Sequence, residues 1–421
     1  MWAKPTQRKL VLYSIVYFMA MIALHGDLLW QIRENIPQGL SDFSAFYTAG
    51  RILDDGQGGR LYDDALQESV QRSLVPQAVQ RRGVTLLYNH PPFEALLCTP
   101  LARFSYRTAF AIWLVVNLAL LFSIPFLLRS RLQELGKVPL YLWPLACLAF
   151  FPIVIALIQG QDSILLLFLY CLAWAALERS SELWAGSWLA LGLYKYHLVV
   201  PFVLPMWRRK KLIASFLSGV ALLGLVSLSI TGWPSLLGYP RYVWRSEHEP
   251  KYILNSPRGL IANFRGLISA VVPAAHPEIA ASLIVLLSVL ALLLMLHAAG
   301  KTAWGDSGSR RALLALNLVG TVLLSYHIYV HDLSLLFLAI VVVLDILLSS
   351  PPIPKWTRTT LGLCITILFF TPLYLVLSLR YTQFWIMTIV LLVFFIALLS
   401  LLNSLCAQTG GTGSLPVSAS R

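Results

Sequence analysis

Charged residues are scarce in this chain of 421 residues: Asp, Glu, Lys and Arg make up 12% of it, whereas 58% is hydrophobic. A water-soluble domain carries roughly twice that share of charged residues. The apolar runs are long enough to cross a bilayer as helices of about 20 residues. The composition therefore excludes a soluble globular protein and predicts an all-α, polytopic membrane protein.

Several cofactor motifs are also missing. The five cysteines lie in or beside apolar stretches without metal-ligand spacing, so neither a disulfide framework nor a zinc site is predicted. No Gly-rich phosphate loop occurs and Asp42 has no partner in a D-x-D pair, so neither nucleotide binding nor an obligatory metal is indicated. Much of the net charge of +13 sits in short clusters beside apolar runs, where it sets membrane topology. We expect no cofactor, no metal and no nucleic-acid partner.

The positions of the basic residues predict the topology. Lys4, Arg8 and Lys9 precede the first apolar run and no small-residue cleavage site follows it, so we expect a retained first helix and a cytoplasmic N-terminus. About ten full crossings of the plasma membrane follow by the length criterion. The expected divisions are 1–30 (N-terminus and first helix), 31–106 (outer-face loop with amphipathic helices), 107–231 (membrane helices), 232–278 (second outer-face loop), 279–404 (membrane helices) and 405–421 (cytoplasmic tail).

Residues 184–207 conflict with a simple crossing. One unbroken helix would place the cluster Arg208, Arg209, Lys210 and Lys211 on the outer face, against the positive-inside rule. Lys195 lies at the middle of this run, where a charge costs about 3 kcal/mol unless it reaches water or an anion. We therefore predict a pair of half-helices that turns at residues 195–197 and lines a cavity.

The stretch DFSAFYTAG, residues 42–50, begins the first outer loop. As a helix it places Phe43, Phe46, Tyr47 and Gly50 on one face, with Asp42 at its entrance. Two roles are open for Asp42. It could be an N-cap that accepts backbone N–H groups, or a general base that takes a proton from an acceptor hydroxyl.

With this topology, polar residues from six segments meet at the outer face. Lys, Arg and His at a membrane boundary suit the phosphate of an anionic lipid. Simpler roles stay open: helix caps for Gln161 and Asp162, a buried histidine for His327, and headgroup contacts for Arg258 and Arg265. The set comprises Asp42, Tyr88, His90, Gln161, Asp162, Lys195, His197, Arg258, Arg265, His327, His331 and Asp332.

The ordered motifs resemble glycosyltransferase family 87. They are DFSAFYTAG, LYD at 61–63, YNHPPFEALLCTPLA from Tyr88, GQ at 160–161, LALGLYK ending at Lys195, and HD at 331–332. The resemblance covers residues 42–348 and departs from the family pattern where Asn89 and His90 separate Tyr88 from the two prolines. It implies an integral membrane enzyme of the GT-C class, related to mannosyltransferases that use polyprenyl-phosphate mannose. It also implies Asp42 as the catalytic aspartate and Lys195, His331 and Asp332 on the donor side.

We therefore expect an inverting membrane glycosyltransferase that moves a hexose, mannose first, from a polyprenyl-phosphate sugar to a lipid-linked or glycan acceptor among membrane lipids. Asp42 would be the base, and Lys195, His331 and Arg265 would hold the phosphate. The substrate pocket would contain Tyr47, Tyr88, His90, Gln161, His197 and Asp332. The alternatives are a lipid or sugar transporter, which needs a polar path through both leaflets, and an envelope-assembly scaffold, which needs no base.

Overall fold

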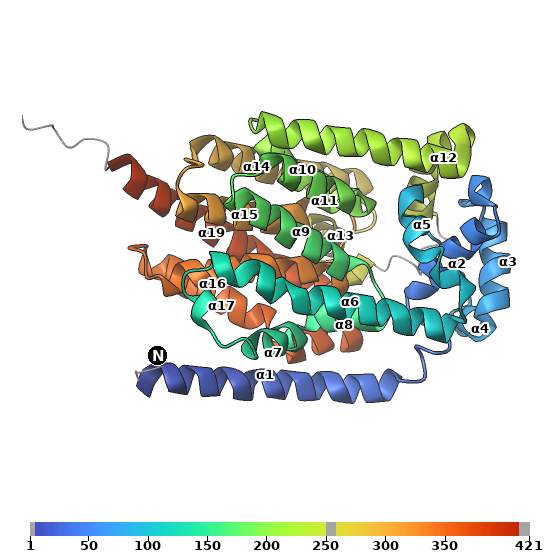
Figure 1. Cartoon of the computed structure of the whole chain (residues 1–421), viewed down its shortest axis with the longest axis horizontal. Helices are drawn as coiled ribbons and strands as arrows, with labels where there is room; N and C mark the ends of the chain where they lie inside the picture. Colours follow the sequence, from blue (N-terminus) through green and yellow to red (C-terminus); the bar gives the residue numbers. More distant parts are fainter. Residues whose placement is uncertain (1–4, 250–257, 412–421) are drawn as a thin grey trace, which may run out of the picture.

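A computed structural model describes residues 5–249 and 258–411. This described part of the chain contains helices and no strand, as the composition predicts. Most of the long helices lie roughly side by side, and the short helices α2 to α5 gather at one end of the bundle, which we name the cap end (Figure 1). The N-terminus of α1 and the end of α19 lie at the opposite end.

The helices of the bundle are α1 (Pro5–Ile32), α6 (Tyr106–Leu128), α7 (Leu142–Ala149), α8 (Phe151–Gln159), α9 (Ser163–Glu178), α10 (Glu182–Leu191), α11 (Tyr196–Val203), α12 (Lys210–His248), α14 (Pro277–Lys301), α15 (Ser307–Leu324), α16 (Leu336–Leu348), α17 (Lys355–Leu368), α18 (Thr371–Tyr374) and α19 (Met387–Gly411). The shorter ones are α2 (Phe43–Asp54), α3 (Asp64–Leu74), α4 (Pro76–Arg82), α5 (Pro92–Cys98) and α13 (Phe264–Val271).

Seven helical stretches in the described residues are long and apolar enough to cross a membrane, or up to nine if two bent pairs each count as one span. The bent pairs are α7 with α8, and α17 with residues 371–380. The number of membrane crossings predicted from the sequence is higher because it includes α9 and α15. Helix α9 has only 16 residues, and Arg310 and Arg311 lower the hydropathy of α15.

The stretch 182–206 is a hairpin, although its 25 residues are long and apolar enough to count as one span. Glu182, at the start of α10, forms an ion pair with Arg209, just beyond α11. A straight helix would hold Glu182 and Arg209 about 40 Å apart. Gly186 also packs so closely on α12 that a Cβ there would lie 2.2 Å from the Leu212 carbonyl oxygen. The chain therefore turns back at η5 (Gly192–Lys195), as the predicted pair of half-helices requires.

Ion pairs gather at the end of the bundle opposite the cap. Glu178 contacts Arg310 at 3.0 Å and Arg311 at 2.6 Å. The Arg209 guanidinium lies 4.7 Å from the ring centroid of Trp304, whose carbonyl accepts a hydrogen bond from Arg310. These residues define the basic end of the molecule. The Lys195 turn lies at the other end of the hairpin from Arg209, and hence near the cap.

The predicted second outer loop, 232–278, begins with a helix. Helix α12 breaks at Gly232, which adopts φ 72° and ψ 170°, and a second helical part then runs to His248. Beyond the break, the Tyr239 hydroxyl donates to the Asn89 carbonyl at 3.0 Å, and Arg245 pairs with Asp64 at 2.8 Å. The second part of α12 therefore holds the cap in place. Residues 250–257 of the predicted loop lie outside the described residues.

Helix α2 forms the inner layer of the cap, as its amphipathic pattern predicts. Phe43, Phe46, Tyr47 and Gly50 are all buried. Gly50 lets α2 approach α5 closely, because a Cβ at this position would lie 2.5 Å from the Cys98 carbonyl oxygen. This packing fixes the start of α2, and with it the residue that precedes the helix, Asp42.

Candidate active site

A cavity of about 520 Å³ is lined by residues of both the cap and the bundle. Its volume is within the range of roughly 300–1,000 Å³ that ligand pockets occupy. Apolar side chains of α1 and α8 form part of the wall. Eight of the ten predicted site residues line it: Asp42, Tyr88, His90, Gln161, Lys195, His197, His331 and Asp332.

Asp42 faces this cavity and does not cap α2. Its side chain makes no hydrogen bond to the first turn of the helix. Instead, Oδ2 accepts a hydrogen bond of 2.8 Å from Nε2 of Gln161, and the Asp42 backbone N–H donates to Oε1 of Gln159 at 3.1 Å. The capping role is therefore excluded in this structure. Asp162, for which a capping role was also open, makes no side-chain capping bond to α9 either.

Lys195 lies at the turn of the hairpin, where its side chain is 3% exposed. Its Nζ contacts Oδ1 of Asp332 at 2.6 Å and Oδ1 of Asp162 at 2.8 Å, and donates to Oγ of Ser163 at 2.7 Å. A buried ammonium needs such partners because desolvation of an unpaired charge is costly. Two carboxylates contact this one ammonium group, so negative charge is in excess when both are ionised.

Asp332 and His331 belong to η9 (Val330–Leu335), which leads into α16. Oδ2 of Asp332 accepts the Tyr329 backbone N–H at 3.0 Å and lies 3.4 Å from Nε2 of His331. Asp332 therefore fixes both the hairpin, through Lys195, and the turn that presents His331 to the cavity.

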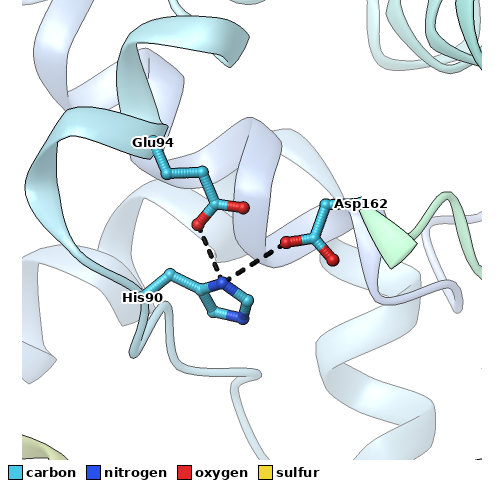
Figure 2. Close-up of side chains that lie close together, drawn as sticks. All are labelled: His90, Glu94 and Asp162. Atoms are coloured by element: carbon cyan, nitrogen blue, oxygen red, sulfur yellow. Dashed lines mark ion pairs between the residues drawn. The ribbon is translucent and has the colours of Figure 1, made fainter. Parts of the chain in front are cut away.

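Sequence reasoning missed Glu94, and it placed Asp162 in the outer-face set without a specific role. Nδ1 of His90 lies 2.8 Å from Oε2 of Glu94 and 3.5 Å from Oδ2 of Asp162 (Figure 2). Burial raises the pKa of Glu94 well above its usual value, and the Asp162 charge raises it further. Burial also lowers the pKa of His90. The i, i+4 spacing of His90 and Glu94 could have indicated that the two side chains lie close together. It was overlooked because residues 93–101 are mostly apolar and suggest a segment at the membrane interface.

Two predicted site residues do not line the cavity. The Tyr47 hydroxyl donates to the Phe104 carbonyl at 2.6 Å, and its ring packs against Tyr106 inside the cap, so it is a core residue of the cap. Arg265 donates from Nη1 to the Tyr326 carbonyl at 3.1 Å. The side chain of Arg258 lies outside the described residues. Among the described residues that line the cavity, Lys195 is the only lysine or arginine.

The comparison with known protein families matches residues 88–326 to glycosyltransferase family 87. This match spans more than half of the 421 residues. The chain belongs to glycosyltransferase family 87. The protein is therefore a membrane glycosyltransferase, with a sugar donor and an acceptor as its substrates. Neither the curated proteins nor the solved structures give a match.

The family 87 match includes Tyr88, His90, Gln161 and Lys195. Asp42 lies before the matched residues, and His331 and Asp332 lie after them. The cavity brings these three residues together with Tyr88, His90, Gln161 and Lys195 of the matched segment. Gln161 is the direct link, because it donates to Asp42.

Gly160 positions Gln161, and with it the hydrogen bond from Gln161 to Asp42. It ends α8 at φ 62°, and a Cβ would lie 2.7 Å from Cβ of Phe43 and 3.0 Å from Cε2 of Phe110. We expect Gly160→Ala to cost about 2–4 kcal/mol, from backbone strain and overpacking, and to slow sugar transfer by moving Gln161 away from Asp42. Thermal unfolding and transfer rate would be measured together.

Gly83→Ala is the matched control for Gly160→Ala. Gly83 also ends a helix at positive φ, 70°, but has no atom within 4 Å of an added Cβ. The two variants therefore share the backbone strain and differ in the clash. Equal effects of both on stability and transfer would contradict the role given to the Phe43 contact.

Proposed function

We propose that this membrane glycosyltransferase moves a hexose, with mannose the first candidate, from a polyprenyl-phosphate donor to a hydroxyl of a lipid-linked or glycan acceptor. One observation carries the proposal: Asp42 is free of any capping role and lines the same cavity as Lys195, His331 and Asp332. A base and a phosphate-binding group are what transfer from a lipid phosphate needs.

Asp42 acts as the general base in this proposal. Gln161 holds Oδ2 of Asp42, which leaves Oδ1 for the acceptor hydroxyl. As Asp42 takes the proton, the acceptor oxygen attacks the anomeric carbon and the bond from that carbon to the phosphate oxygen breaks. The electron pair of that bond leaves with the polyprenyl phosphate. Attack from the face opposite the phosphate inverts the anomeric configuration.

The donor phosphate lies beside Lys195 and His331 in this proposal, with Tyr88, His90 and His197 around the sugar and acceptor. The polyprenyl chain follows the apolar wall, where Leu28 and Ile32 of α1 line the cavity. Arg265 acts by positioning instead of touching the phosphate, because it holds the Tyr326 carbonyl next to His327 of the cavity wall.

The proposed reaction is tested by transfer in proteoliposomes. Purified protein would be supplied with radiolabelled polyprenyl-phosphate mannose, and with the glucose and galactose analogues, together with a mixed lipid extract as the acceptor. We expect label to appear in an acceptor with one of these donors. Labelling with none of the three donors, by protein that is folded, would contradict the donor class.

The proposal places the cavity at the outer face of the plasma membrane and both termini in the cytoplasm. The basic end, with Arg209, Arg310 and Arg311, lies opposite the cap. Clusters of Lys and Arg usually face the cytoplasm, so this end is expected inside and the cap outside.

Labelling of single cysteines tests this orientation. In a Cys406→Ser background, Arg60→Cys places a thiol on the cap and Arg208→Cys places one near the basic end, and both native side chains are exposed. An impermeant thiol reagent added to sealed right-side-out vesicles should label Arg60→Cys, and should label Arg208→Cys only after permeabilisation. Labelling of Arg208→Cys in sealed vesicles would reverse the orientation.

A transporter is the weaker alternative. Between the cavity and the basic end, the described residues of α9, α15 and α16 form a mostly apolar buried core that includes Leu166, Leu316, Phe337 and Val341. A substrate path through both leaflets would need polar side chains there. A scaffold role would need neither the cavity nor the carboxylate that lines it.

A further inference from the structure

His90, Glu94 and Asp162 form a compact group of ligand atoms beside the cavity. One nitrogen of His90 and one oxygen of each carboxylate all lie within 4.8 Å of one another. Figure 2 shows the three side chains converging from two separate parts of the chain. His90 lines the cavity, whereas Glu94 and Asp162 are each 2% exposed behind it. Such spacing suits three ligands around one metal ion, with metal–ligand bonds of about 2.0–2.2 Å.

Both buried carboxylates of this group have oxygens without a hydrogen bond. In the described part of the chain, no N–H or O–H group donates to Oε1 of Glu94 or to either oxygen of Asp162 when both carboxylates are ionised. Asp162 has ion contacts, Oδ1 with Lys195 at 2.8 Å and Oδ2 with His90 at 3.5 Å, and its carboxyl group also pairs with that of Glu94, which needs a shared proton when no cation is bound. Buried polar atoms are normally hydrogen-bonded, so atoms left without a partner need an explanation. A bound cation supplies the missing partner for both carboxylates.

The charges of the group also favour a cation. When Glu94 is deprotonated, as a metal ligand must be, Glu94, Asp162 and Asp332 carry three negative charges and Lys195 supplies one positive charge, which leaves a net charge of −2 for a cation to balance. A buried site with uncompensated carboxylates is costly and repels the phosphate of an anionic donor. One divalent cation makes this group neutral.

We propose that His90, Glu94 and Asp162 bind one divalent metal cation beside the cavity. In a role that rests on the proposed function, this cation compensates the charge of the donor phosphate, which Lys195 alone does not. One imidazole and two carboxylates form a mixed nitrogen and oxygen ligand set that suits Mn²⁺ or Zn²⁺ better than Ca²⁺, which takes oxygen ligands. The sequence motifs for metal sites miss this set because its members come from two separate segments.

Binding of Mn²⁺ tests the site without any sugar donor. Full-length protein in nanodiscs would be stripped with EDTA, dialysed and titrated with MnCl₂, with free Mn²⁺ followed by electron paramagnetic resonance. We expect one saturable site per chain. Affinity should fall at least tenfold in Glu94→Gln and in His90→Ala, since loss of an outer-shell partner alone costs about 10–100-fold. Glu68→Gln is the control, because Glu68 pairs with Arg72 on the exposed face of α3.

Three results separate the site from the reaction. Absence of a saturable site in wild type, or equal affinity in wild type, Glu94→Gln and His90→Ala, overturns the cation site. Asp42→Asn should bind Mn²⁺ like wild type, so loss of transfer in that variant tests the base and not the cation. If wild type binds Mn²⁺ but transfers sugar equally fast with and without EDTA, charge compensation of the phosphate is overturned.

Thermal unfolding of each variant, measured with and without Mn²⁺, shows whether the variant folds. We expect Mn²⁺ to raise the melting temperature of wild type and Glu68→Gln and to leave Glu94→Gln unchanged, because a ligand that binds only the folded state stabilises it. An equal rise in wild type and Glu94→Gln would also overturn the site.

Discussion

Asp42→Asn should slow sugar transfer by about 10²–10⁴-fold, which is the usual contribution of a general base. The amide cannot take the proton of the acceptor hydroxyl. The fold should persist, because asparagine keeps the shape of the side chain, its oxygen still accepts from Gln161, and Asp42 makes no capping bond to α2. The measurement is the initial rate of transfer in proteoliposomes, with the melting temperature of the same preparation.

Asp63 provides a matched control for Asp42, since it also precedes a helix of the cap. Its side chain does cap α3, by accepting the backbone N–H groups of Ala65 at 3.0 Å and Leu66 at 3.2 Å. Asp63→Ala should therefore cost about 1 kcal/mol of stability and leave transfer nearly unchanged. If Asp42→Asn transferred sugar at the wild-type rate, the base would have to be another carboxylate, and Asp332 would be examined next.

The membrane helices follow from the sequence because apolar runs must form helices in a bilayer. The hairpin follows from a conflict of charge: Arg208 to Lys211 could not end an outward crossing, and Lys195 marked the turn. The extension of α12 past Gly232 was not predictable in this way. Gly232, Pro234 and Pro240 indicate a loop locally, whereas contacts with Asn89 and Asp64 of the cap stabilise a helix.

The sequence was enough to predict which helix ends meet at the site. It was not enough to predict the individual contacts between side chains there. Topology alone brings Asp42, Lys195 and Asp332 to one end of the molecule. Helical periodicity shows that Tyr47 is buried, but not that its neighbours are Phe104 and Tyr106 instead of the cavity. The pairing of Glu94 with Asp162 depends on the rotation of α5 about its axis, which no local pattern determines.

Lys195→Met should be strongly destabilising, because it leaves Asp162 and Asp332 buried without their shared cation. Removing one partner of a buried ion pair costs about 3–5 kcal/mol. We expect a large fall in melting temperature together with loss of transfer. Lys137→Met is the matched control: its ion pair with Glu134 is equally short, 2.6 Å, but 68% of the lysine side chain is exposed, so little change is expected.

The double variant Lys195→Met with Asp332→Asn separates the structural role of Lys195 from its role at the donor. The introduced asparagine would carry no charge but would keep an oxygen for the Tyr329 backbone N–H, so part of the lost stability should return. Transfer should stay low, because the cavity would then lack its only described lysine or arginine. Recovery of both stability and transfer would mean that Lys195 only balances Asp332, and that the donor phosphate is held by other groups. A single variant Lys195→Met that melts like wild type would instead mean that Asp162 and Asp332 are not both ionised.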